Sequence, residues 1–290
     1  MQELIDVQRG LWPTLKALAI RPGEALRQHL GAGPRPLMNP GRYLLTAIVV
    51  NFGTVRALTW LGMREGAAQR LSDEMTEAEA KAAQAGAAEE QVLSILSKLT
   101  GDLQVAFTSQ TYYVASSLLL AAILALAVWR LFGEQIDRGA QALAFSFFTV
   151  GQAVFLETVL WATYVPVARL ATGAPARLDS SVGGVVPILY VTAATWRTFG
   201  PGWRAAGKGA VASVWATVEQ LLIIGSAVGT YSLWVVYSRT AGEGDRPTLN
   251  LTFQTGDTET ALLSVGMSFA AVFVVPVLLH ACIEAYCRLR

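Results

Sequence analysis

The chain has 290 residues, of which 53% are hydrophobic and only 15% are charged, and its mean hydropathy is +0.43. Because soluble domains carry about 25% charged residues, this composition favours a membrane protein over a soluble globular one. The formal net charge of +1 creates no global field that would attract nucleic acid, so we expect no nucleic-acid partner.

Residues 1–41 are predicted to form a cytoplasmic amphipathic segment that does not cross the membrane. They contain Glu3 and Lys16 and no continuous apolar stretch, so we expect no signal peptide. Pro13 suits the start of a second helix. Pro22 suits the start of a further helix, and Gly31 suits its end.

Two interpretations of this segment stay open, and both can hold together. It could be a short domain that packs on the cytoplasmic ends of the membrane spans. It could also lie on anionic lipid, with an aromatic side chain at headgroup depth and basic side chains toward the phosphates. The residues predicted to lie at the lipid interface are Trp12, Lys16, Arg21 and Arg27.

Six stretches meet or approach the length of about 20 apolar residues that a membrane-spanning helix needs. They predict spans at 42–62, 111–132, 140–167, 182–199, 210–237 and 261–285. Lys and Arg gather in the loops that face the cytoplasm when both termini are cytoplasmic, and the positive-inside rule favours that orientation. The sequence therefore predicts an all-α integral membrane protein with six spans, and the Ala-rich composition favours the bacterial inner membrane.

Two inserts are predicted outside the membrane on the other side. Residues 63–110 form the larger one, and Thr76 with Glu79 fits a helix-capping box. Residues 92–99 carry an apolar stripe, which predicts an amphipathic helix that packs on the spans or meets a partner. Residues 238–260 form a second extracytoplasmic loop.

No nucleotide-binding loop, zinc motif or catalytic triad is visible in the sequence, so we expect no enzyme activity and no cofactor. Cys282 and Cys287 are five residues apart on one predicted helix. That spacing does not suit a disulfide, and no other ligand cluster lies nearby, so we interpret both as structural thiols without a metal.

Polar residues inside the predicted spans are the more informative feature, because such residues usually face a protein interior or a wet cavity. They are Asn51, Arg56, Glu157, Glu219, His280 and Glu284. Arg56 and Glu157 lie at similar predicted depths, which predicts an ion pair. Glu219 lies near the middle of the fifth span. It is predicted to be neutral and hydrogen-bonded to a neighbouring helix, or to belong to a polar pathway together with the other two.

Small residues predict where two helices approach closely. Gly225 and Gly229 form a GxxxG step in the fifth span. Leu221 stands one step earlier on the same ridge, so the close-packing surface is not expected to reach Glu219. Pro276 is predicted to kink the sixth span, and Pro187 could break the fourth.

Two stretches resemble a bacterial membrane family known as domain of unknown function 3667. The first is "TLKALAIRPGEALRQHLGAGPRPLMNPGRYLL", with matching positions at Thr14, Leu15, Pro22, Gly23, Gly33, Arg35, Pro40 and Tyr43. The second is "ILYVTAATWRTFG", with matching positions at Tyr190, Ala194, Arg197, Phe199 and Gly200. The resemblance implies a multi-spanning inner-membrane protein with a cytoplasmic N-terminal helical segment, and it implies no catalytic residue.

We therefore expect a non-enzymatic accessory or scaffold component that acts through contacts with the lipid bilayer and with partner subunits, as a homo-oligomer or within a larger membrane complex. The alternative is a proton-coupled transporter or channel for a small solute, which would use Glu219, Glu157 and Arg56.

Overall fold

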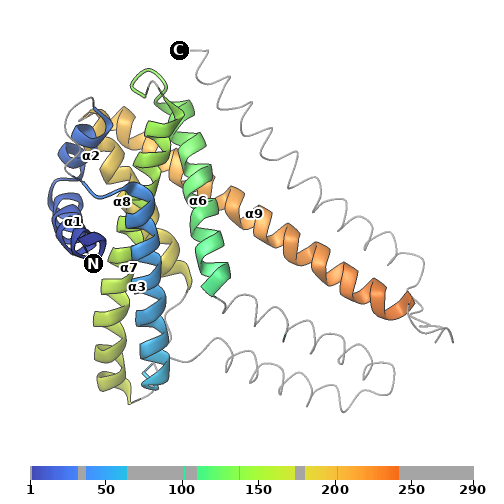
Figure 1. Cartoon of the computed structure of the whole chain (residues 1–290). Coiled ribbons are helices and arrows are strands. Elements are labelled where there is room, and N and C mark those ends of the chain that lie inside the picture. Colours follow the sequence, from blue (N-terminus) through green and yellow to red (C-terminus); the bar gives the residue numbers. More distant parts are fainter. Residues whose placement is uncertain are drawn as a thin grey trace. The chain divides into compact units, whose positions relative to one another are not determined.

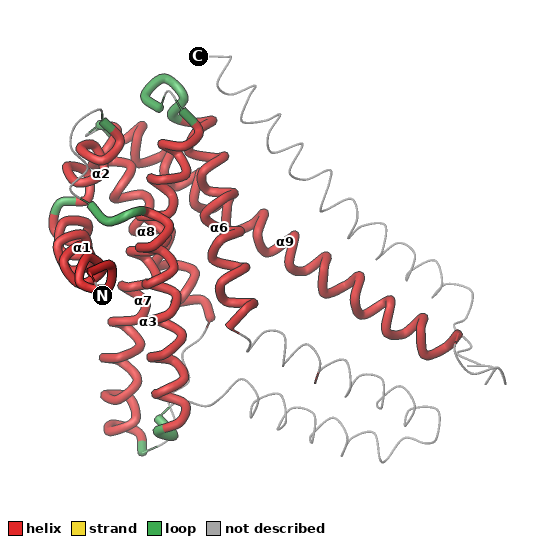
Figure 2. Tube along the Cα trace, viewed as in Figure 1, coloured by secondary structure: helices red, strands yellow, loops and turns green. Residues whose placement is uncertain are grey.

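The computed structural model describes residues 2–31, 37–63, 101, 110–136, 138–173, 180–200 and 202–241. Within these ranges the regular elements are seven α-helices and there is no strand, as Figure 2 shows. The prediction of an all-helical chain is therefore confirmed for the part of the chain that is described. The chain divides into two compact units, one of Met1–Gly66 with Gln110–Val218 and the other of Ala67–Ser109 with Glu219–Arg290.

Figure 1 labels the helices in chain order. They are α1 (Gln2–Ile20), α2 (Pro22–Leu30), α3 (Pro40–Trp60), α6 (Gln110–Leu131), α7 (Gly139–Thr172), α8 (Ser180–Phe199) and α9 (Trp203–Ala241).

Four of these helices are long and apolar enough to cross a membrane, which indicates a membrane protein. The four stretches are Pro40–Trp60, Thr111–Leu131, Gly139–Thr172 and Trp203–Tyr231. They match the predicted first, second, third and fifth spans. The predicted fourth span coincides with α8, which is not among the four.

Several predictions fall outside the described residues. They are the sixth span at 261–285, with its Pro276, Cys282 and Cys287, the helical stripe at 92–99, and most of the loop at 238–260.

Helices α7 and α9 extend beyond the apolar stretches that predicted them. At 1.5 Å per residue, the 34 residues of α7 make a helix about 51 Å long, which exceeds the ~30 Å hydrocarbon core of a bilayer. A helix satisfies its backbone hydrogen bonds internally, so it does not have to end where the apolar stretch ends. Helix α7 ends at Thr172. The next residue, Gly173, caps it: it adopts a left-handed φ of 70° and donates its N–H to the carbonyl of Arg169.

Pro13 does not begin a second helix, so that prediction was wrong. It lies inside α1, which continues from Gln2 to Ile20. A proline inside a helix removes one backbone hydrogen bond, but the turn that contains it has other partners. The Thr14 hydroxyl donates to the Gly10 carbonyl at 2.6 Å and accepts from the Met38 N–H at 2.9 Å, which ties this turn to the segment before α3.

Helices α3 and α7 lie side by side and run in the same direction (Figure 1). Near the start of α3, the Tyr43 hydroxyl donates to the side-chain carbonyl of Gln152 in the first half of α7. Further along, Asn51 contacts Thr158. At the far end, an Arg169 N–H donates to the carbonyl of a glycine after α3, Gly62. The contacts advance together along both helices, so the two helices are parallel.

The start of α3, the end of α6, the start of α7, the end of α8 and the start of α9 meet at one end of the first unit. There the Lys208 ammonium of α9 donates to the Leu131 carbonyl of α6 at 2.8 Å. The Gln141 side chain of α7 donates to the Leu30 carbonyl of α2 at 2.9 Å. Consecutive long helices of this unit therefore alternate in direction, and α1 with α2 packs at this end. We call α1 and α2 together the cap.

Candidate functional site

Asn51 joins two helices inside the first unit. It is fully buried in α3, and its side-chain N–H donates to the Thr158 hydroxyl of α7 at 3.0 Å. The Thr158 hydroxyl in turn donates to the Val154 carbonyl at 2.8 Å. The buried amide is therefore part of the α3–α7 contact.

Arg56 and Glu157 do not form the ion pair that their similar depths predicted. Arg56 is exposed, and its guanidinium carbon lies 5.5 Å from the ring centroid of Phe52, one turn earlier in α3. Glu157 is half-buried and accepts a hydrogen bond from the Trp161 indole at 3.1 Å, one turn later in α7. Depth gave no information about which face of its helix each side chain occupies, and each has a partner on its own helix.

Glu219 belongs to the second unit, whereas Glu157 and Arg56 belong to the first. It is half-buried and lies in α9 one turn after the buried Trp215. His280 and Glu284 lie outside the described residues. The polar pathway proposed for Glu219 and its companions therefore remains a prediction.

Close helix contacts occur at glycines other than the predicted pair. A Cβ on Gly225 would meet no described atom within 4 Å, and Gly229 is half-buried. In contrast, a Cβ on Gly151 would lie 2.9 Å from the Tyr43 ring of α3, and one on Gly209 would lie 2.8 Å from the Cβ of Thr195 in α8. The GxxxG step at Gly225 stays a prediction. Neither Gly151 nor Gly209 has another glycine four residues away, so the GxxxG pattern does not select them.

The cap is fixed to the bundle rather than only lying beside it. Leu18 and Leu26 are fully buried. The Tyr190 hydroxyl of α8 donates to the Leu18 carbonyl at 2.9 Å. Gly23 approaches Arg197 so closely that an added Cβ would lie 2.5 Å from the Arg197 Cβ, and closer still to its backbone carbonyl. The interpretation as a small packed segment therefore accounts for the buried face of the cap.

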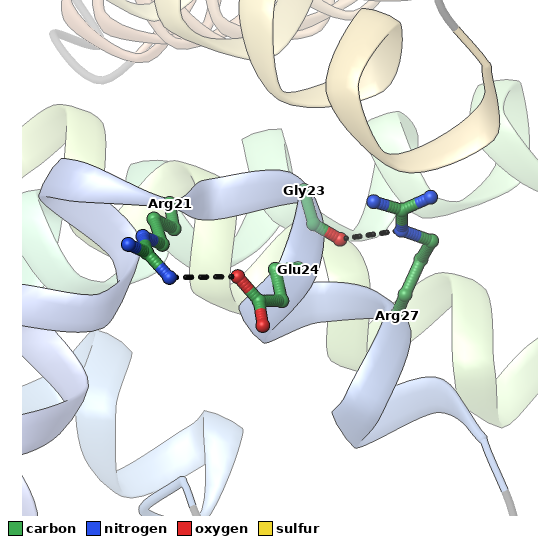
Figure 3. A network of polar contacts seen from close by, with 4 residues as sticks. All are labelled: Arg21, Gly23, Glu24 and Arg27. Atoms are coloured by element: carbon green, nitrogen blue, oxygen red, sulfur yellow. Dashed lines mark hydrogen bonds and ion pairs between the residues drawn. The ribbon is translucent and has the colours of Figure 1, made fainter.

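The four residues predicted to lie at the lipid interface are all exposed. Trp12 is 67% exposed, and Lys16 lies one turn further along α1. Figure 3 shows Arg21, which directly precedes α2, and Arg27 of α2. Arg21 forms an ion pair with Glu24 at 3.5 Å, and the Arg27 Nε donates to the Gly23 carbonyl at 3.1 Å. The cap therefore exposes an aromatic side chain and cations.

A cavity of about 840 Å³ lies where the cap meets the ends of the long helices. The described residues that line it come from the end of α2, the start of α3, the turn that leads from α6 into α7, the start of α7 and the end of α8. The lining residues are Arg27, His29, Leu30, Gly31, Pro40, Gln135, Ile136, Arg138, Ala140, Gln141, Ala144, Thr198 and Phe199. We call this the cap cavity.

One glutamine, Gln141, links two segments that line the cap cavity. The Gln141 side-chain oxygen accepts the Arg138 backbone N–H at 3.1 Å, and its amide donates to the Leu30 carbonyl at 2.9 Å. This caps the start of α7 and links it to the end of α2. His29, which also lines the cavity, is buried, and its ring packs edge-to-face on the Phe148 ring with the two centroids 4.8 Å apart.

The sequence analysis did not identify the cap cavity. It assigned Arg27 to the lipid interface and did not single out Arg138. Thr198 lies at the end of a predicted span between Arg197 and Phe199, and the sequence does not show that it lines a cavity. No family model, curated protein or solved structure matches the chain. The resemblance to the domain of unknown function 3667 therefore stays a prediction.

Proposed function

We propose that the protein is a non-enzymatic accessory or scaffold component of a bacterial inner membrane, which acts through contacts with lipid and with partner subunits. The observation that carries this proposal is the two-sided cap. Its inner face is fixed to α8 through Tyr190 and Gly23, while its outer face exposes Trp12 and Ile20, at 67% and 60%. A surface held in place in this way suits docking.

The surfaces of the long helices support embedding in lipid. Large apolar side chains are exposed along them, among them Val49, Val159, Leu170, Leu189 and Val211. Buried positions of the same helices include polar residues, among them Asn51, Gln152, Thr158 and Thr195. Exposed apolar surfaces, with polar residues placed among the mainly apolar buried ones, are expected where the surroundings are lipid.

The proposed orientation places the cap in the cytoplasm. Basic residues gather at the end of the first unit where the cap packs: Arg42, Arg130, Arg138, Arg197 and Lys208. The positive-inside rule assigns such an end to the cytoplasmic side. The predicted inserts at 63–110 and 238–260 would then lie on the opposite side.

The test is purification at native abundance from the source membrane, with the mass of the particle measured in lipid nanodiscs. The proposal expects a homo-oligomer or a complex with a partner subunit of fixed stoichiometry. Trp12→Ala should shift the particle toward the monomer. Leu170→Ala is the matched control, because Leu170 is 86% exposed but lies near the far end of α7. A strictly monomeric wild-type particle with no co-purifying protein would refute the proposal.

A further inference from the structure

The cap cavity has a lining that suits an anion with an organic body. We propose that it binds a phosphate ester group, held by Arg138 at the start of α7, Arg27 of α2 and Thr198 at the end of α8. This inference does not depend on the scaffold role, because all the described residues that line the cavity belong to the first unit.

Two guanidinium groups line the cavity with donors to spare. Arg27 uses its Nε for the Gly23 carbonyl, which leaves four N–H donors on its terminal nitrogens. Neither Arg27 nor Arg138 forms an ion pair with an acidic residue of the described ranges. No Asp or Glu is among the described lining residues. Arginine is the preferred partner of phosphate, because its planar fork matches two phosphate oxygens at once.

The start of α7 adds a second source of positive potential. Ala140, in its first turn, lines the cavity. The first N–H groups of a helix have no acceptor within the helix, and the aligned peptide dipoles make this end electropositive. The Arg138 N–H donates to the Gln141 side chain, and the N–H groups of Gln141 and Ala142 donate to the Arg138 carbonyl. The N–H groups left for a ligand are therefore those of Gly139 and Ala140. Phosphates bind at helix starts for these two reasons.

Thr198 is the observation that points to a ligand. It is 5% exposed, it lines the cavity, and its hydroxyl has no hydrogen-bond partner among the described residues. One turn earlier in α8, the Thr195 hydroxyl donates to the carbonyls of Val191 and Thr192, both at 2.9 Å. A buried hydroxyl without a partner is unfavourable. The oxygen itself is buried, so the side chain must turn about χ1 before a phosphate oxygen in the cavity can accept from its hydroxyl.

The size and the apolar part of the lining favour an ester over a bare ion. A volume of about 840 Å³ falls within the range of ~300–1,000 Å³ typical of small-molecule sites. Leu30, Ile136 and Phe199 provide apolar surface in the same cavity. They would contact the organic part of the ligand while the arginines bind the phosphate.

The source of the phosphate ester can be a lipid headgroup or a soluble molecule, and two probes distinguish them. Glycerol 3-phosphate is titrated into the full-length protein in nanodiscs of neutral phosphatidylcholine. Phosphatidylglycerol retained by the protein is counted by native mass spectrometry after mixed-lipid solubilisation. Binding of the soluble probe assigns the site to a soluble ester, and retention of the lipid alone assigns it to a headgroup. Either result supports the site.

Three variants test the assigned residues. Arg138→Gln should weaken binding about tenfold or more, because it removes a charge-assisted contact. Thr198→Val keeps the shape and removes the hydroxyl, so binding should fall several-fold, while Thr198→Ser should stay close to wild type. Arg42→Gln is the matched control, because Arg42 is exposed in the first turn of α3 and does not line the cavity.

Two outcomes would overturn the proposal. One is that the wild-type protein binds neither probe. The other is that Arg42→Gln loses as much affinity as Arg138→Gln, which would show a diffuse charge effect and no site. If Arg138→Gln fails to fold, the comparison of Thr198→Val with Thr198→Ser decides: equal binding by both variants would also refute the proposal.

Discussion

Gly23→Ala is expected to loosen the cap. An alanine Cβ at this position would lie 2.5 Å from the Arg197 Cβ, whereas ordinary contacts begin at 3.4 Å. Helices α2 and α8 must therefore move apart by at least 0.9 Å, the difference between these two distances. The nearest atoms also include the Arg197 backbone carbonyl, so no change of rotamer relieves the clash.

The size of the effect follows from two opposing contributions. Overpacking of this kind costs about 1–3 kcal/mol. Replacing glycine by alanine stiffens the unfolded segment and returns about 0.4–1 kcal/mol. The net loss of about 1–2 kcal/mol corresponds to a roughly 5- to 30-fold larger population of the undocked cap.

Hydrogen exchange of the α2 amides, followed by mass spectrometry in nanodiscs, measures that population. The matched control is Gly10→Ala in α1, whose Cβ would lie 3.6 Å from the Met38 Cβ, an ordinary contact. Exchange in α2 should rise in Gly23→Ala and stay near wild type in Gly10→Ala. Equal protection in Gly23→Ala and the wild-type protein would refute the close contact and, with it, the docking of the cap through this glycine.

Three further predictions concern the long helices. Gly209→Ala should lower the free energy of unfolding in an SDS titration by about 1–3 kcal/mol, because its Cβ would lie 2.8 Å from that of a buried α8 threonine. Gly207→Ala, with nothing within 4 Å, is its control, and an equal loss in both variants would contradict the packing argument. A double-mutant cycle of Asn51→Leu with Thr158→Val should give a coupling of about 0.6 kcal/mol, the average for hydrogen bonds between membrane helices, and a zero value would count against the contact. Glu219→Gln should leave proton flux in proteoliposomes at the wild-type background, whereas a wild-type flux that the variant abolishes would favour the transporter alternative.

Apolar length predicted the long helices well, because a helix in lipid needs a continuous apolar stretch that is visible in one dimension. The predicted span at 111–132 and the helix Gln110–Leu131 nearly coincide. The first span was predicted to start at residue 42, whereas α3 begins at Pro40 after its N-cap residue Asn39. Asn39 accepts the N–H groups of Gly41 and Arg42, and Pro40 takes the first helical position, so the helix begins before the apolar residues do.

Pairing between helices was harder to predict, because it depends on the rotation of each helix about its axis. The GxxxG rule selected Gly225 and Gly229 from spacing alone. The close approaches that the structure shows, at Gly151 and Gly209, occur at single glycines opposite a Tyr ring and a Thr side chain. A spacing rule for one helix has no information about the residue that the neighbouring helix presents.

The cap cavity illustrates the same limit for the candidate site. Arg27 and Arg138 are visible in the sequence as basic residues on one predicted side of the membrane. Their common cavity depends on Gln141, which joins the end of α2 to the start of α7 across more than a hundred residues of chain. The importance of Thr198 depends on a hydrogen bond that is missing, and a sequence cannot show this.

The sequence by itself predicted a helical membrane protein and the positions of the long helices that the structure describes. It also showed that basic residues gather in every second loop. Both patterns are visible because hydropathy and charge are properties of short stretches of chain. Only the tertiary structure decided that α3 and α7 run parallel in contact, that Arg56 and Glu157 have separate partners, and that the cap closes over a basic cavity. These features depend on which faces of separate helices meet. That choice is made by packing and hydrogen bonding between residues far apart in the chain.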